Sequence, residues 1–142
     1  MTVIAIHIGE QQGGPLESVP SVLAHAGCGL EGDRNFYPGG APPGAALTLV
    51  EHEVVEDVGL PPGETRRQLT VGGVRLNDLV GKRFYVGEVE CYGVERCEPC
   101  LHLQQMTRPG LIKDLVHRGG LRADILTSGA ISVGDPVAEL SP

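Results

Sequence analysis

The sequence predicts a mainly β, barrel-like fold with two or three short helices, in one domain over residues 1–142. Glycine (21) and proline (11) are abundant for a chain of 142 residues, which is typical of many short strands joined by tight turns. Aromatic residues make up only 4% and Trp is absent, so we expect an aliphatic core. Antiparallel strands that curl into a barrel also hide their edges.

The first part of the chain predicts two buried strands, a long connection and a short helix. Residues 2–8 (TVIAIHI) and 45–50 (AALTLV) are apolar with little alternation, which favours buried strands. Residues 9–44 are rich in Gly, Pro and Ser, and a connection of this length is usually functional or mobile. From Glu51, valines at helical spacing predict a short helix that stops near Gly59.

The second part predicts further strands and two more short helices. A Gly-Gly turn breaks the first strand, Gly87 turns a hairpin, and a Ser128-Gly129 turn separates the last two strands. One helix opens at Cys97-Glu98-Pro99-Cys100, and the other covers residues 110–117. The strands are predicted at residues 68–76, 82–86, 88–96, 121–127 and 136–140.

Charge and hydropathy argue against two classes of partner. The net charge of −7 comes from residues 1–63, whose only base is Arg34, so the basic surface that duplex nucleic acid requires is missing. No segment approaches the ~18 apolar residues of a membrane helix, and the amino terminus lacks the basic region and cleavage site of a signal peptide. We therefore expect a cytoplasmic protein that binds neither nucleic acid nor membranes.

Cys100 is the sharpest candidate for chemistry. It follows Pro99 at the predicted start of a helix, where unpaired backbone N–H groups and the helix dipole favour thiolate over thiol. Such a thiolate could ligate a soft metal or carry a persulfide sulfur, and the alternative is a buried cysteine acting as a small apolar residue. Cys97 and Cys100 form a C-x-x-C pair, but a second pair at zinc-site spacing is missing, and a redox pair would need a βαβ context. Cys91 lies mid-strand and is expected in the core.

Arginines beside polar and glycine residues form a second group of candidates. Glycine lets backbone N–H groups approach an anion closely while a guanidinium binds it in a bidentate manner, although each arginine alone could be a solvated surface charge. Asp33 could orient a guanidinium, bind a ligand amine or form an Asx turn. The arginines concerned are Arg34, Arg66, Arg67 and Arg118, and His117 beside the last is a possible ligand contact or a helix C-terminal histidine.

Four segments together carry a resemblance to a known family. They are Glu31-Gly32-Asp33-Arg34, Arg66-Arg67-Gln68 running into LTVGGVRLNDLVGKRFYVGE, Cys97-Glu98-Pro99-Cys100, and HRGGLRADILTSGAISVGDPV from His117. In their order and spacing, over most of residues 31–137, they resemble the MOSC domain, the carboxy-terminal module of molybdenum-cofactor sulfurases that also occurs as stand-alone bacterial proteins.

The resemblance implies a MOSC-type β-barrel-like fold and a role in binding the anionic pterin of the molybdenum cofactor. Cys100 matches the family's Pro-Cys cysteine, as metal ligand or sulfur acceptor, and Gln68 stands where the family usually has Asn. The resemblance also implies a sulfur carrier or cofactor handler, with sulfurtransferase-like activity or a part in a molybdenum-dependent reductase, and a sulfur donor or molybdoenzyme as partner. Pyridoxal phosphate binding is a further association of the family. The cofactor-binding residues it implies are Asp33, Arg34, Arg67, Gln68, His117 and Arg118.

Two other classes of function fit parts of the sequence. A non-catalytic adaptor could use the acidic first 63 residues, including the charges of residues 51–57, to steer a basic partner. A zinc-stabilised β domain could use the C-x-x-C pair.

Overall fold

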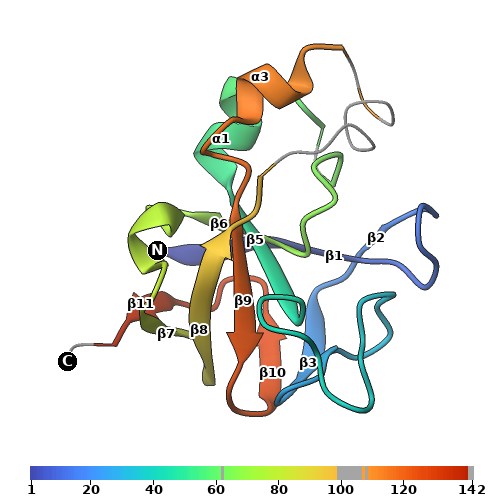
Figure 1. Cartoon of the computed structure of the whole chain (residues 1–142), viewed down its shortest axis with the longest axis vertical. Helices are drawn as coiled ribbons and strands as arrows, with labels where there is room; N and C mark the ends of the chain where they lie inside the picture. The colour runs from blue at the N-terminus through green and yellow to red at the C-terminus, as the bar shows by residue number, and fades with distance from the viewer. Residues whose placement is uncertain (62, 99–106, 108, 141–142) are drawn as a thin grey trace.

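The computed structural model describes residues 1–61, 63–98, 107 and 109–140, and it is mainly β (Figure 1). An eight-stranded sheet runs in the order β11-β7-β8-β9-β5-β6-β1-β2, and a three-stranded sheet runs in the order β10-β3-β4. The strands of the larger sheet are β1 (Thr2–Ile8), β2 (Glu17–Ser18), β5 (Leu47–Glu51), β6 (Leu69–Gly72), β7 (Arg83–Val86), β8 (Val89–Arg96), β9 (Leu121–Ile125) and β11 (Val137–Glu139). The smaller sheet holds β3 (Ser21–His25), β4 (Gly29–Leu30) and β10 (Gly129–Ser132).

The larger sheet curls until its two ends approach each other. Thr2 at the start of β1 forms a bridge with Pro136, which immediately precedes the edge strand β11. The Val3 amide donates to the Asp135 carbonyl at 2.9 Å, and the Val137 amide donates to the Met1 carbonyl at 2.9 Å. The sheet is therefore barrel-like, as predicted.

The core of this sheet is aliphatic. Leucine, valine and isoleucine side chains fill it, and Phe84 is the one aromatic ring among the large fully buried side chains of the described residues. Ile6, Leu49, Leu69 and Leu121, from four neighbouring strands, are 0% exposed. Their burial removes apolar surface from water, which is the main stabilising term of such a fold.

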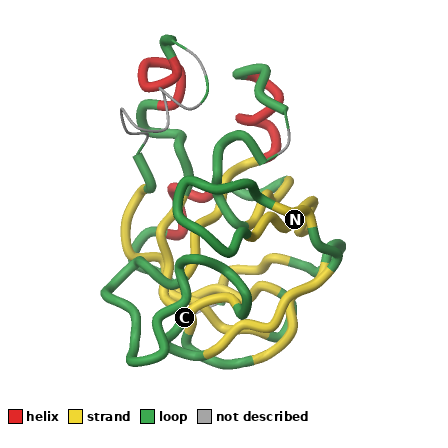
Figure 2. Tube along the Cα trace, turned by 90° about the vertical axis from the view of Figure 1, so that its right-hand side faces the viewer, coloured by secondary structure: helices red, strands yellow, loops and turns green. Residues whose placement is uncertain are grey.

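Two short α-helices lie together at one end of the sheet (Figures 1 and 2). Helix α1 (His52–Asp57) connects the parallel strands β5 and β6, and α3 (Leu111–Leu115) precedes β9. Val54 and Val58 pack with Leu111 and Leu115 in a small apolar cluster of their own. A 3₁₀ helix, η1 (Leu76–Leu79), follows β6. In the described part of the chain, no helix has the length and apolar character needed to cross a membrane.

The structure corrects the sequence prediction in two places. Residues 9–44, expected to form one irregular connection, contain the short strands β2, β3 and β4. Gly129, predicted to lie in the Ser128-Gly129 turn, instead begins β10 (Gly129–Ser132), a strand that was not predicted and that pairs with β3. Strands of two to five residues are too short to show an alternating pattern, so their pairing is decided by partners distant in sequence. The predicted helix that begins at Cys97 lies largely outside the described residues.

Candidate functional site

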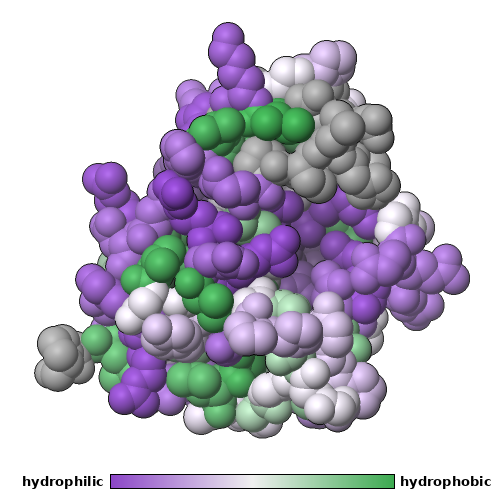
Figure 3. All heavy atoms as spheres, in the orientation of Figure 1, coloured by the Kyte–Doolittle hydropathy of each residue, from purple (hydrophilic) through white to green (hydrophobic). Residues whose placement is uncertain are grey.

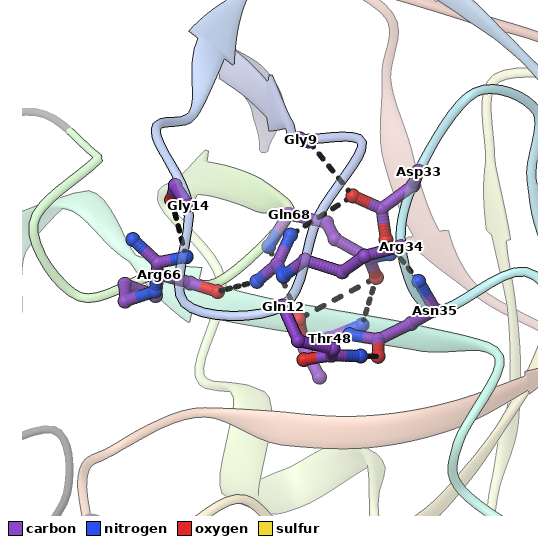
Figure 4. Close-up of polar contacts among 9 residues, drawn as sticks. All are labelled: Gly9, Gln12, Gly14, Asp33, Arg34, Asn35, Thr48, Arg66 and Gln68. Atoms are coloured by element: carbon purple, nitrogen blue, oxygen red, sulfur yellow. Dashed lines mark hydrogen bonds and ion pairs between the residues drawn. The ribbon is translucent and has the colours of Figure 1, made fainter.

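Asp33 stands at the centre of a buried polar network (Figure 4). Its side chain is 0% exposed, and its carboxylate accepts four hydrogen bonds. Oδ1 accepts from the Gly9 amide at 3.0 Å and from Arg34 Nη1 at 2.9 Å. Oδ2 accepts from the Asn35 amide at 3.0 Å and from Gln68 Nε2 at 2.6 Å. The carboxylate therefore joins the end of β1, its own loop and the start of β6, with all of its acceptor positions in use.

Gln68 extends this network into the sheet. Its side-chain Oε1 accepts from the backbone amide of Thr48 on β5 at 2.8 Å, and its backbone amide donates to Thr48 Oγ1 at 3.0 Å. Its Nε2 donates to Asp33, so both ends of the side-chain amide are bonded inside the protein. The residue is 1% exposed, which gives it a supporting position between two strands and a loop.

Arg34 connects the network to Arg66. The Arg34 side chain is 7% exposed, and besides its pair with Asp33 it donates from Nη2 to the Arg66 carbonyl at 3.2 Å. Arg66 has a φ of 60°, in the left-handed region that residues other than glycine rarely adopt. Such a conformation persists where the surroundings fix it, and here Arg34 holds the carbonyl of the strained residue.

A cavity of about 360 Å³ opens beside Arg66. We call it the Arg66 cavity, and Figure 3 shows hydrophilic residues gathered on this face of the molecule, below the helices. Arg66 Nη2 donates to the Gly14 carbonyl at 2.8 Å, and the other N–H groups of the guanidinium have no partner among the described residues. Burial lowers the pKa of Arg66, and the positive charge of Arg34 lowers it further. The residues that line the cavity are His7, Gly13, Gly14, Pro15, Leu16, Gly63, Glu64, Arg66 and Thr107.

Arg67 has a different environment from its neighbour. It is 9% exposed and binds three backbone carbonyls, those of Gly119 at 2.8 Å, Cys97 at 3.1 Å and Thr65 at 3.2 Å. Its guanidinium therefore ties the start of β6 to the end of β8 and to the loop before β9. It does not line the Arg66 cavity.

His117 and Arg118 lie beside the helices. Arg118 Nη1 donates to Asp57 Oδ2 at 2.6 Å, at the end of α1. His117 has a left-handed φ of 61°, and its amide and Nδ1 lie 3.1 Å and 3.3 Å from the carboxylate oxygens of Glu98. Neither residue lines the Arg66 cavity, so the predicted site residues divide into a network around Asp33, the Arg67 contacts and this outer pair.

Comparison with known families identifies the chain. Residues 44–138 match the family model of the MOSC domain, and these residues are more than half of the sequence. The chain belongs to the MOSC domain family. This family is associated with molybdenum-cofactor binding, and the match confirms the resemblance that the motifs carry. The search of curated protein sequences found no match.

Solved structures show the same MOSC fold at low sequence identity. YuaD from Bacillus subtilis is 17% identical with a TM-score of 0.75, and the match covers 96% of this chain and 94% of that one. YiiM from Geobacillus stearothermophilus is 19% identical with a TM-score of 0.70, over 99% and 75% of the two chains. YiiM from Escherichia coli is 16% identical with a TM-score of 0.71, over 100% and 71%. At such identities these likenesses establish the fold.

The cysteines of this MOSC domain have distinct surroundings. Cys100, the predicted nucleophile and metal ligand, lies outside the described residues. Cys97 is 2% exposed, its amide donates to the Gly120 carbonyl at 2.8 Å, and its carbonyl accepts from Arg67. Cys91 is in the core as predicted, where burial raises its pKa to about 12. Within the part of the chain that the structure describes, no three His, Cys, Asp or Glu side chains gather as a metal site.

The cofactor-binding residues that the resemblance implies do not include two residues of the Arg66 cavity. The sequence marks Arg66 as a candidate together with Arg67, but the motif does not show which guanidinium faces the cavity, because this depends on the left-handed turn at Arg66. His7 stands in an apolar strand, and its position gave no signal of a cavity. The Gly13-Gly14 pair in the long connection was the one available hint of a backbone that approaches a ligand.

Proposed function

We propose that this MOSC domain binds an anionic molybdenum-cofactor pterin in the Arg66 cavity and handles its metal or sulfur through Cys100. The observation that carries the proposal is the half-buried Arg66 guanidinium, which lines the cavity with one of its donors bonded to Gly14 and the others unpaired among the described residues. A cavity of about 360 Å³ is within the range of small-molecule sites.

The charges around the cavity favour an anion. Asp33 is the buried carboxylate of the network, and its acceptor positions are already filled by Arg34 and three other donors. The Arg66 guanidinium therefore has no bond to the carboxylate of the buried network, and Glu64 is the one acidic residue among the described residues that line the cavity. An oxyanion can bind such a guanidinium through short, charge-assisted hydrogen bonds.

In our proposal, the other predicted cofactor residues position Arg66 and the neighbouring loops and do not line the cavity themselves. Arg34 positions the Arg66 backbone, while Asp33 and Gln68 fix Arg34 and the loops beside it. Arg67 would position the segment that follows Cys97, because it bonds both the Cys97 and the Thr65 carbonyls. His117 and Arg118 would act at the outer side, where Glu98 and Asp57 hold them.

The position of Cys97 in the chain supports a role for Cys100 at the cavity. The Arg67 guanidinium donates to the carbonyls of both Thr65 and Cys97. Thr65 in turn lies between Glu64 and Arg66, which line the cavity. Cys100 is three residues beyond Cys97, a separation that extended chain spans in at most ~10 Å. The bound cofactor would supply redox chemistry at its metal. The Cys100 thiolate would ligate that metal or accept the terminal sulfur of a partner's persulfide, whose remaining thiolate leaves.

Cofactor analysis of variants tests the proposal. The protein is purified from a host that makes molybdenum cofactor, and molybdenum and pterin are measured per chain for wild type, Arg66→Gln, Arg75→Gln and Cys100→Ser. Arg75 is a matched control because its side chain is 89% exposed and its ion pair with Asp78 is long at 3.8 Å. We expect Arg66→Gln to lose at least ~10-fold in pterin retention, the scale of a lost charge-assisted hydrogen bond, and Arg75→Gln to retain it.

The outcomes separate the two halves of the proposal. Equal pterin retention in Arg66→Gln and wild type, or no pterin in wild type, would remove the cavity from the function. Loss of molybdenum or of the persulfide in Cys100→Ser, with pterin retained, would support the role of the thiol, and unchanged metal and sulfur would remove it. The predicted cytoplasmic location, sulfur donor and molybdoenzyme partner remain predictions.

A further inference from the structure

His7 is a buried histidine whose ring has an unsatisfied nitrogen. The residue lies on β1, is 6% exposed and lines the Arg66 cavity. Its backbone amide donates to the Gln68 carbonyl at 2.8 Å, so the strand position is fixed. Its side-chain Nδ1 is buried and has no hydrogen-bond partner among the residues that the structure describes. Buried polar atoms are normally satisfied, so an exception at a cavity wall calls for an explanation.

The opposite edge of the ring faces the wall of the cavity. A Cβ placed on Gly63 would lie 2.9 Å from His7 Cδ2 and 3.1 Å from His7 Nε2, so the Cδ2–Nε2 edge packs directly on this glycine. Gly63 is itself a lining residue and has a φ of +85°, which suits glycine. The absence of a side chain at residue 63 leaves room for the imidazole at the cavity wall.

The surroundings select one form of the ring. Burial lowers the pKa of His7, so the neutral imidazole is favoured. A proton on Nδ1 would be a buried donor without an acceptor, which costs more than a buried lone pair without a donor. The proton therefore belongs on Nε2, at the edge that packs against the lining glycine.

We propose that His7 is a ligand-binding residue of the Arg66 cavity, donating from its neutral Nε2–H to an oxygen of the oxyanion group that Arg66 binds. The inference rests on the proposed function and deepens it, because it adds a second donor and specifies the chemical class of the bound group as an oxyanion. Arg66 contributes the charge, and His7 contributes a neutral donor that gains no charge of its own. A phosphate ester of a pterin and an inorganic oxyanion share this chemistry.

Binding measurements with conservative variants test the role of Nε2. In His7→Gln the side-chain amide nitrogen reaches the position of Nε2, whereas in His7→Asn it reaches only that of Nδ1. Inorganic phosphate, molybdate and a pterin phosphate are titrated calorimetrically into wild type, both variants and Arg66→Gln, after thermal unfolding shows that each is folded. We expect His7→Asn to bind about 10-fold more weakly and His7→Gln to bind within about 3-fold of wild type.

An NMR measurement on the wild type makes the test independent of the variants. Long-range ¹H–¹⁵N spectra of the imidazole rings report which nitrogen carries the proton, and His7 is assigned by the signal that His7→Gln lacks. We expect protonation at Nε2 with Nδ1 bare, and an Nε2 shift when any of the three probes is added. Tighter binding of the pterin phosphate would identify an ester phosphate as the bound group. Tighter binding of molybdate would identify an inorganic oxyanion. Both outcomes support the inference.

The negative results are distinguishable. If Arg66→Gln loses binding while His7→Asn binds like wild type and the His7 signal does not move, the inference on His7 is wrong and the cavity remains an anion site. A proton found on Nδ1 also overturns the inference. If wild type binds none of the three probes, the proposed function and the inference fail together.

Discussion

Replacing Asp33 by Asn should destabilise the protein far more than the loss of one charge at its surface. Two donors that face Oδ2, the Asn35 amide and Gln68 Nε2, would meet the new NH₂ group of the Asn. Rotating the Gln68 amide does not solve this, because its NH₂ would then face the Thr48 amide. Arg34 would also lose its carboxylate while its side chain stays 7% exposed.

The expected magnitude follows from the burial of that ion pair. Breaking a buried pair by removing one partner costs about 3–5 kcal/mol, and in a protein of this size this lowers Tm by roughly 10 °C or more. Urea unfolding followed by circular dichroism measures the free energy. Asp78→Asn is the matched control, because Asp78 is 66% exposed and its pair with Arg75 spans 3.8 Å, so about 0–1 kcal/mol is expected there. If Asp33→Asn falls within 1 kcal/mol of the control, the reasoning about this network is refuted.

Three further predictions concern other buried groups. Because burial lowers the pKa of His7, the unfolded chain takes up a proton first, so stability should fall as the pH drops below the ordinary value of 6.5. The urea midpoint of wild type should therefore decrease more between pH 7.5 and 5.5 than that of His7→Gln, and equal decreases would contradict this. Cys91, with its pKa raised to about 12, should resist iodoacetamide at pH 8 in the folded protein and react once it is unfolded, as followed by mass spectrometry. Rapid labelling of the folded protein would count against it. Gly120→Ala should destabilise by more than about 3 kcal/mol in urea unfolding, because the added Cβ would strike the Leu49 carbonyl, whereas Gly134→Ala, with open space, should cost about 1 kcal/mol. Similar losses in the two variants would show that the collision is unimportant.

The parts of the fold that could be predicted are those with a strong local signal. Residues 2–8, 45–50 and 82–96 are apolar or alternating, and they form β1, β5 and the β7–β8 hairpin, whose turn residue Gly87 has a φ of 58°. The valines after Glu51 indicate α1 for the same reason. The strands within residues 9–44 depend on pairing with distant partners, which a local pattern does not contain.

The candidate site was predictable in composition but not in its arrangement. The Gly-Asp-Arg segment and the paired arginines pointed to Asp33, Arg34 and Gln68, and the structure joins these three in one network. The sequence does not show which of the two guanidinium groups, Arg66 or Arg67, has unpaired N–H groups. This depends on the backbone carbonyls that bind each guanidinium, and the fold determines where those carbonyls lie. The same holds for His7, because its significance comes from Gly63, more than fifty residues away in sequence.

The three arginines around the Asp33 network have distinct electrostatic positions. Arg34 is neutralised by a buried carboxylate, and Arg67 is enclosed by three carbonyl oxygens whose partial charges compensate it. Arg66 has one carbonyl bond and a cavity beside it, and the charge of Arg34 adds to the cost of keeping it there. The positive potential at the cavity wall therefore comes from the Arg66 guanidinium, whose backbone Arg34 fixes. On the proposed function, an anion bound beside Arg66 would reduce that potential, so the free energy that the strained, desolvated arginine costs would become part of the affinity for the anion.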